Sequence, residues 1–148
     1  MNAQVQKEHL MAVGLDIGQT RTGVAKAFLA ENKIIIKPLK ILKNPKSNDL
    51  LSELRKFNFA ELVIGLPLDG YGNETEQSVK IRNIARRLQQ RLPANSSVIL
   101  HDEYCSSETA RERLDSLCMK RDYLDDVAAA VILEDYFKLL GKKTLFVL

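Results

Sequence analysis

The sequence has few cysteines, glycines and prolines, and no long apolar run. Its 148 residues include two cysteines, seven glycines and four prolines. Cys105 and Cys118 form no Cys-x-x-Cys pair and have no histidine at ligand spacing, which favours a reducing, cytoplasmic setting. Glycine and proline together are too scarce for a low-complexity or collagen-like chain.

The sequence also has no stretch that predicts a membrane span or a secretory leader. The longest apolar run covers only Val127 to Leu133, whereas a membrane span needs about 18 residues. Near the N-terminus, Asp16 interrupts the apolar stretch that begins at Leu10, so we expect no secretory leader. The length suits one domain over residues 1–148, with 1–10 as a flexible tail.

The charge is nearly balanced, with 22 basic and 19 acidic residues and a net charge of +3. Two segments nevertheless carry bases without acids: 33–46 has five lysines, and 78–91 has one lysine and four arginines. Each cluster is equally consistent with a solvated surface and with a surface that faces phosphates.

Alternating and helical apolar patterns predict an α/β fold with antiparallel strands first and parallel βα units afterwards. Strands are expected at 11–17, 22–28, 33–37 (ended or pushed to an edge by Pro38), 61–65 and 97–101. Helices are expected at 49–57 (capped by Ser47), from a capping box of Asn73 and Glu76 to about 92, from Ser106 or Ser107 to about 119, and at 125–140.

An acid inside the first strand is the strongest local anomaly. Asp16 lies between Leu15 and Ile17, where a buried and unpaired carboxylate costs several kcal/mol. A cation, hydrogen-bond donors or an opening to solvent would stabilise it. The alternative is an Asx-type turn with Gly18 and Gln19.

Further acids stand where α/β sheets present functional groups. Asp102 and Glu103 end the last expected strand, and strand alternation lets only one of them share a face with Asp16. Asp125 and Asp126 open the final helix, where dipole stabilisation alone is the commoner explanation. Three acids at a central strand, a strand end and a helix start could converge.

Carboxylates that converge without histidine or cysteine ligands suit hard cations such as Mg²⁺ or Mn²⁺. Two such ions about 3.5–4 Å apart stabilise the attacking and leaving oxygens of a phosphodiester. A nucleophilic triad fits poorly, because His9 lies in the expected tail and His101 has no strand-to-helix elbow.

Four segments, in order, resemble the signatures of the YqgF/RuvX family. They are Gly14–Gly18 with Arg21–Ala25, Leu62–Leu68 with Gly72-Asn-Glu74, Asp102-Glu103 with Ser107 and Ala110, and Leu124-Asp125 with Ala128-Ala129 and Ile132-Leu133. The resemblance runs from about Val13 to Tyr136. It implies an RNase H-like fold, which we expect as a mixed five-stranded sheet flanked by helices.

The resemblance also implies a function and a site. The family's acidic set falls on Asp16, Glu103 and Asp125, with Asp126 the weaker candidate. The implied activity is a metal-dependent endonuclease that uses Mg²⁺ or Mn²⁺ and processes the 5′ end of precursor 16S rRNA.

Three alternatives remain open. One is a Holliday junction resolvase acting on DNA, which needs two sites on a two-fold dimer. Another is a non-catalytic nucleic-acid-binding or transcription-associated module. The third, an actin-like kinase, is disfavoured because 148 residues supply one domain instead of two. The protein is expected to be a monomer or a homodimer.

Departures from the family lie near the expected substrate side. Tyr104 replaces the usual arginine, Gln19-Thr20 replaces the usual Thr-Lys, and the segment between Met119 and Asp125 is shorter. Affinity for phosphates must come from bases. The residues expected to bind nucleic acid are Arg21, Lys120, Arg121 and Tyr71, the last by stacking on an unpaired base.

Overall fold

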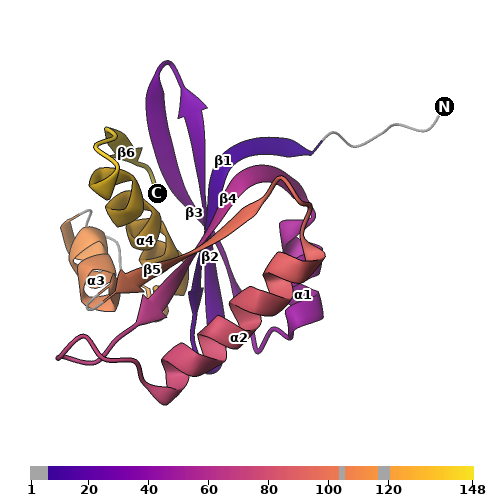
Figure 1. Cartoon of the computed structure of the whole chain (residues 1–148). Coiled ribbons are helices and arrows are strands. Elements are labelled where there is room, and N and C mark those ends of the chain that lie inside the picture. The colour runs from indigo at the N-terminus through magenta and orange to yellow at the C-terminus, as the bar shows by residue number, and fades with distance from the viewer. Residues whose placement is uncertain (1–6, 104–105, 117–120) are drawn as a thin grey trace.

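A computed structural model describes residues 7–103, 106–116 and 121–148, which form a curled mixed sheet with helices on both faces (Figure 1). The strands are β1 (Glu8–Ile17), β2 (Arg21–Ala30), β3 (Lys33–Lys43), β4 (Phe57–Pro67), β5 (Ser97–Glu103) and β6 (Thr144–Phe146). The helices are α1 (Ser47–Leu54), α2 (Glu76–Arg91), α3 (Ser106–Ser116) and α4 (Asp125–Leu139).

The sheet has the expected mixed topology, with strand order β5-β4-β1-β2-β3-β6. β1, β2 and β3 pair antiparallel, whereas β4 and β5 add parallel beside β1. The expected count of five strands is wrong, because β6 adds parallel to β3 at Ile34–Ile36. Three residues are too few to show an alternating pattern, so this strand has no sequence signal.

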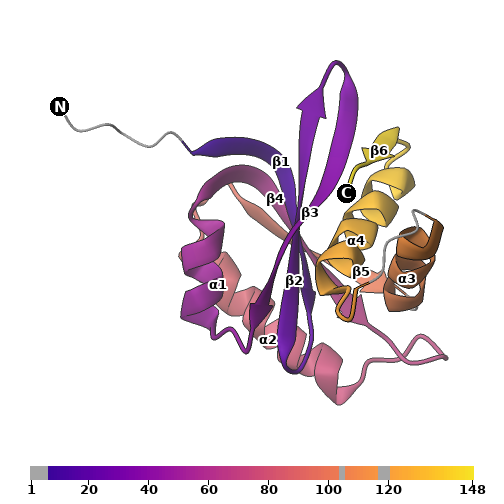
Figure 2. The ribbon, with the colours of Figure 1, turned by 180° about the vertical axis from the view of Figure 1, so that it is seen from behind.

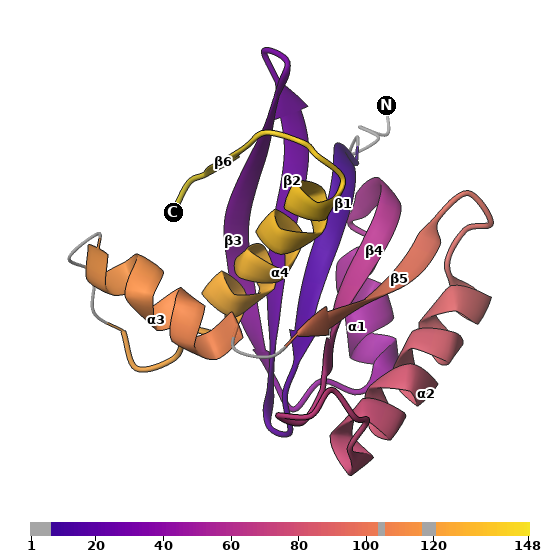
Figure 3. The ribbon, with the colours of Figure 1, turned by 60° about the vertical axis from the view of Figure 1, so that its left-hand side comes forward.

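Helices divide between the two faces of the sheet, as opposite views of the ribbon show (Figures 1 and 2). On one face, α1 and α2 pack against β1 through Val13 and Leu15. On the other, α4 covers the sheet, and α3 packs against α4 through Ala110 and Leu114 (Figure 3). Since side chains alternate along a strand, Ala12, Gly14 and then Asp16 point to the α4 face.

Helix α4 lies unusually close to the sheet. A Cβ atom added at Gly23 of β2 would stand 1.7 Å from the Asp125 carbonyl oxygen, and one at Gly14 would stand 2.9 Å from that of Ala129. The helix side of this contact is the buried run Ala128–Ala130. The backbones of sheet and helix therefore touch directly, which fixes where α4 begins.

Several element boundaries differ from the sequence-based expectations. Strand β1 starts at Glu8, so the expected tail over 1–10 is too long at its inner end. Strand β3 continues through Pro38, because a register shift between Val24 and Ala25 of β2 accommodates the residue that lacks an N–H donor.

Helix starts differ as well. Helix α1 is capped by Lys46, whose N–H donates to the Asp49 carboxylate at 2.8 Å, instead of by Ser47. The capping box of α2 is Thr75 with Ser78, two residues beyond the expected Asn73 and Glu76. No helix formed by the described residues is long and apolar enough to cross a membrane.

Candidate active site

Asp16, Glu103 and Asp125 come from three separate elements and lie on the α4 face of the sheet, close enough for the charges of Glu103 and Asp125 to act on Asp16. Asp16 is near the end of β1, opposite Gly23 of β2, and Gly23 touches the backbone of Asp125. Glu103 ends β5, and a Cβ added at Gly65 of β4 would stand 2.9 Å from the Glu103 carboxyl group. Two glycines thus make the room in which the acids gather.

The neighbouring acid Asp102 does not join them. Its side chain is exposed, and it is not among the charges that act on Asp16. The alternation of β5 therefore directs Glu103 toward Asp16, which the sequence alone left open.

Burial and like charge act together on Asp16. Burial is the larger cause and the negative charges of Glu103 and Asp125 add to it, raising the pKa of Asp16 from 3.8 to about 8. The turn after Asp16 is closed by the Gly18 N–H, which donates to the Arg21 carbonyl at 2.8 Å. Among the described residues this backbone bond, and not an Asx bond from Asp16, closes the turn, so the turn does not explain the partly buried acid.

Asp125 is neutralised by Arg21. The Arg21 Nε donates to Asp125 Oδ2 at 3.1 Å, and the guanidinium lies 3.9 Å from the ring centre of Tyr123. Arg21, Tyr123 and Asp125 line a shallow cavity of about 200 Å³ together with Arg111. Sequence reasoning missed Tyr123, and no pattern in the sequence links it to Arg21.

Asp126 has a different partner. Arg121 donates from both terminal nitrogens to its carboxylate, at 3.1 and 2.9 Å, and the Val127 N–H donates to it as well. Asp126 is 7% exposed. Arg121, expected to bind nucleic acid, thus uses its planar fork within the protein.

The other expected contacts with nucleic acid are only partly described. Tyr71, in the loop after β4, is 92% exposed and so is accessible for stacking. Lys120 and the unusual Tyr104 lie outside the described residues. The binding roles of Arg21, Lys120, Arg121 and Tyr71 stay predictions.

The carboxylates of Asp16, Glu103 and Asp125 suit a hard cation by their chemistry, although they are not positioned to hold one in this conformation. Three carboxylates without nitrogen or sulfur donors match the preference of Mg²⁺ and Mn²⁺. Burial and the charges of the two other acids raise the pKa of Asp16, and a bound cation would offset both effects. Within the described segments, no three Asp, Glu, His or Cys side chains stand in metal-holding positions, and Arg21 occupies Asp125.

A sheet of three antiparallel and then parallel strands, with acids on its α4 face, defines an RNase H-like fold. The crystal structure of the fowlpox virus Holliday junction resolvase is similar, with a TM-score of 0.57, 17% identity, and coverage of 87% of this chain and 98% of that chain. This likeness confirms the expected fold.

The RuvX family model, described as "Holliday junction resolvase", matches residues 10–139, and the chain belongs to this family. A protein of Alcanivorax borkumensis named "Putative pre-16S rRNA nuclease" is 34% identical over 133 residues, covering 86% of this chain and 95% of its own. One of Fusobacterium nucleatum with the same name is 34% identical over 132 residues, covering 84% and 94%. The family expected from the sequence, a nuclease family, is thereby confirmed.

Proposed function

We propose that this protein is a metal-dependent endonuclease that cuts structured RNA, with precursor 16S rRNA as its substrate. The observation that carries the proposal is that Asp16, Glu103 and Asp125 lie together on the α4 face, where burial first and then the charges of Glu103 and Asp125 raise the pKa of Asp16 to about 8. The names of the relatives from Alcanivorax and Fusobacterium support the RNA substrate.

Asp16, Glu103 and Asp125 would hold the metal, Mg²⁺ or Mn²⁺. When bound, such ions stabilise the attacking and leaving oxygens of a phosphodiester and activate water. The protein's part is to hold three carboxylates on one face and to exclude competing donors. Arg21 contacts only Oδ2 of Asp125, so Oδ1 could bind the metal while the arginine stays beside it, and its terminal nitrogens could then reach a phosphate oxygen.

A four-way DNA junction is the second candidate substrate, because the family model carries the description Holliday junction resolvase. The chemistry at the acids would be the same for either substrate. The two candidates differ in the shape of the nucleic acid, and junction resolution also requires two sites in one assembly.

One experiment separates these possibilities. Labelled precursor 16S rRNA and a synthetic four-way junction are each incubated with the full chain in Mg²⁺, Mn²⁺ or EDTA. We expect cleavage of the RNA in either metal and none in EDTA. Preferential cleavage of the junction would overturn the RNA assignment, and cleavage that persists in EDTA would overturn the metal mechanism.

Neighbouring acids of β5 supply the matched variants. Glu103→Gln should abolish cleavage because it removes a proposed ligand, whereas Asp102→Asn should leave cleavage unchanged because its exposed side chain does not act on Asp16. Equal effects of the two substitutions would contradict the proposed site.

A further inference from the structure

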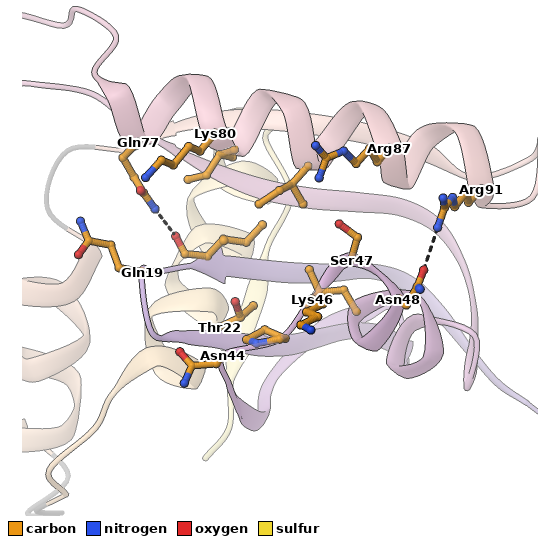
Figure 4. Close-up of a pocket in the computed structure, with 16 residues that line it drawn as sticks. Gln19, Thr22, Asn44, Lys46, Ser47, Asn48, Gln77, Lys80, Arg87 and Arg91 are labelled. Atoms are coloured by element: carbon orange, nitrogen blue, oxygen red, sulfur yellow. Dashed lines mark hydrogen bonds between the residues drawn. The ribbon is translucent and has the colours of Figure 1, made fainter.

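A polar groove lies between α2, the start of α1 and the turn of the β1–β2 hairpin. Its volume is about 880 Å³. One wall is the side of α2 that carries Lys80, Arg87 and Arg91, and the opposite wall is the segment 44–48 (Figure 4). Gln19 of the hairpin turn and Gln77 of α2 stand at the end nearest Asp16.

The charge of this groove is of one sign. Four bases line it and no acid does; the bases are Lys46, Lys80, Arg87 and Arg91. None of the four forms an ion pair with a described residue. Arg91 bonds a neutral group, donating to Asn48 Oδ1 at 2.8 Å. The nearby acid Asp49 is occupied by the cap of α1.

The bases are also spaced along one direction. Lys80, Arg87 and Arg91 are seven and four residues apart on α2, so their Cα atoms span about 16 Å along the helix. The two separations, about 10 and 6 Å, equal about three and two steps of a helical nucleic-acid strand at 3.4 Å each. Such a row can contact every second or third phosphate of one strand over about five nucleotides.

Neutral donors complete the lining. Asn44, Asn48 and the glutamines Gln19 and Gln77 supply amide groups of the kind that contact phosphate and sugar oxygens. Gln77 is held in place, because its Nε2 donates to the Ile17 carbonyl at 3.2 Å. Small-molecule sites are mostly apolar, so this lining fits a polyanion better.

The hairpin turn after β1 joins the groove to the acids along the chain. Ile17 and Gly18 line the groove, while the adjacent Asp16 points to the opposite face of the sheet. Arg21, at the far end of the same turn, contacts Asp125. A strand whose phosphodiester lies at the acids can cross the turn and continue along α2.

We infer that this groove binds the sugar-phosphate backbone of the substrate strand beyond the cleavage site. The inference rests on the proposed function for its link to the acids, but binding in the groove does not itself require cleavage. The shared chemistry is a polynucleotide backbone, and RNA and DNA are separate arms of the test.

The test compares two charge-matched double variants of the full chain. Lys80→Gln with Arg87→Gln removes two groove bases, whereas Lys37→Gln with Arg86→Gln removes two exposed bases that do not line it. Binding to fluorescent single-stranded RNA, DNA of the same sequence and a four-way junction is measured by anisotropy in EDTA, from 50 to 200 mM salt.

We expect the groove variant to bind about tenfold more weakly at low salt. Its plot of log affinity against log salt should be less steep by about 1.4, as the loss of two phosphate contacts on a single strand predicts. The control should bind like the wild type, and both variants should melt like it. A larger loss on RNA than on DNA would assign the groove to RNA, and the reverse to DNA.

Equal losses of affinity in the two double variants, or no binding by the wild type, would overturn the inference that the groove binds nucleic acid. Failure of the proposed function would look different: no cleavage in Mg²⁺ or Mn²⁺, with the groove variant still impaired in binding. Normal binding and cleavage by the groove variant would overturn the groove and leave the nuclease intact.

Discussion

The arginines around the acids and the bases of the groove are used in opposite ways, although elsewhere on α2 Arg82 pairs with Glu74. On the α4 face, Arg21, Arg113 and Arg121 each form an ion pair with a carboxylate, those of Asp125, Glu134 and Asp126. On the α2 face, the groove bases have no described acidic partner. Closeness to the acids in sequence therefore does not identify the bases that are available to a phosphate.

This difference follows from what each face must bury. The α4 face brings acids together in a partly dehydrated place, so the adjacent bases stabilise the fold by pairing with them. The groove bases lie on an exposed helix side, where no buried charge needs compensation. The arginines of the α4 face stabilise the fold through ion pairs, whereas the groove bases remain available to bind an anion.

The largest effect should come from breaking the acidic face. Asp16→Asn is expected to reduce cleavage at least about 100-fold, because it removes a proposed ligand. Its melting temperature without metal should be unchanged or higher, since asparagine avoids the cost of protonating or ionising a carboxyl group at this site. Retained cleavage, or a marked loss of stability, would make Asp16 a structural residue.

Next in size is the contact that sets α4 against the sheet. Gly23→Ala would bring a Cβ atom to 1.7 Å from the Asp125 carbonyl oxygen, so we expect a loss of about 3 kcal/mol or more in unfolding free energy. Gly70→Ala is the control, because nothing stands within 4 Å of that position. Denaturant unfolding measures both, and equal stabilities would show that α4 is not held at Gly23.

The pH dependence of stability sharpens the comparison further. With a folded pKa of about 8 and an ordinary value of 3.8, the native Asp16 binds a proton that the unfolded chain has lost, so stability falls as pH rises through this window. Between pH 5 and 8, wild type should lose more than about 1 kcal/mol relative to Asp16→Asn in metal-free buffer. Parallel curves for the two proteins would contradict the raised pKa.

The smallest effect concerns the pairing of Arg21 with Asp125. Arg21→Gln frees the carboxylate, so the affinity for Mn²⁺ should rise by no more than about fivefold, as expected for a partly exposed ion pair. Arg113→Gln, which breaks the separate pair with Glu134, should leave Mn²⁺ affinity unchanged. Isothermal titration calorimetry without nucleic acid distinguishes them. Weaker Mn²⁺ binding by Arg21→Gln would mean that Arg21 helps to orient Asp125.

Much of the acidic face could be predicted from the sequence. Asp16 stands out because an acid interrupts an apolar strand, and the family signatures select Glu103 over Asp102. The roles of Gly23 and Gly65 could not be read, because a glycine inside a strand does not reveal which backbone or side chain approaches it. That information exists only after α4 and β5 have been placed.

The groove escaped prediction for a related reason. Its walls include bases from the segments 33–46 and 78–91, such as Lys46 and Arg87. Each segment alone has the composition of a solvated surface. Their meeting depends on how α1 and α2 pack on the same face. The pairing of Arg121 with Asp126 is equally invisible in the sequence, since the arginine precedes the helix that carries the acid.

The contact at Gly23 makes the first hairpin and α4 one mechanical unit. Because Gly23 pairs with Asp16 and touches the Asp125 backbone, direct backbone contact fixes the separation of these two acids. Glu103 belongs to β5, which has β4 as its sole neighbour in the described sheet. The position of Glu103 therefore depends on the pairing of β5 with β4 alone, whereas the positions of Asp16 and Asp125 depend on each other.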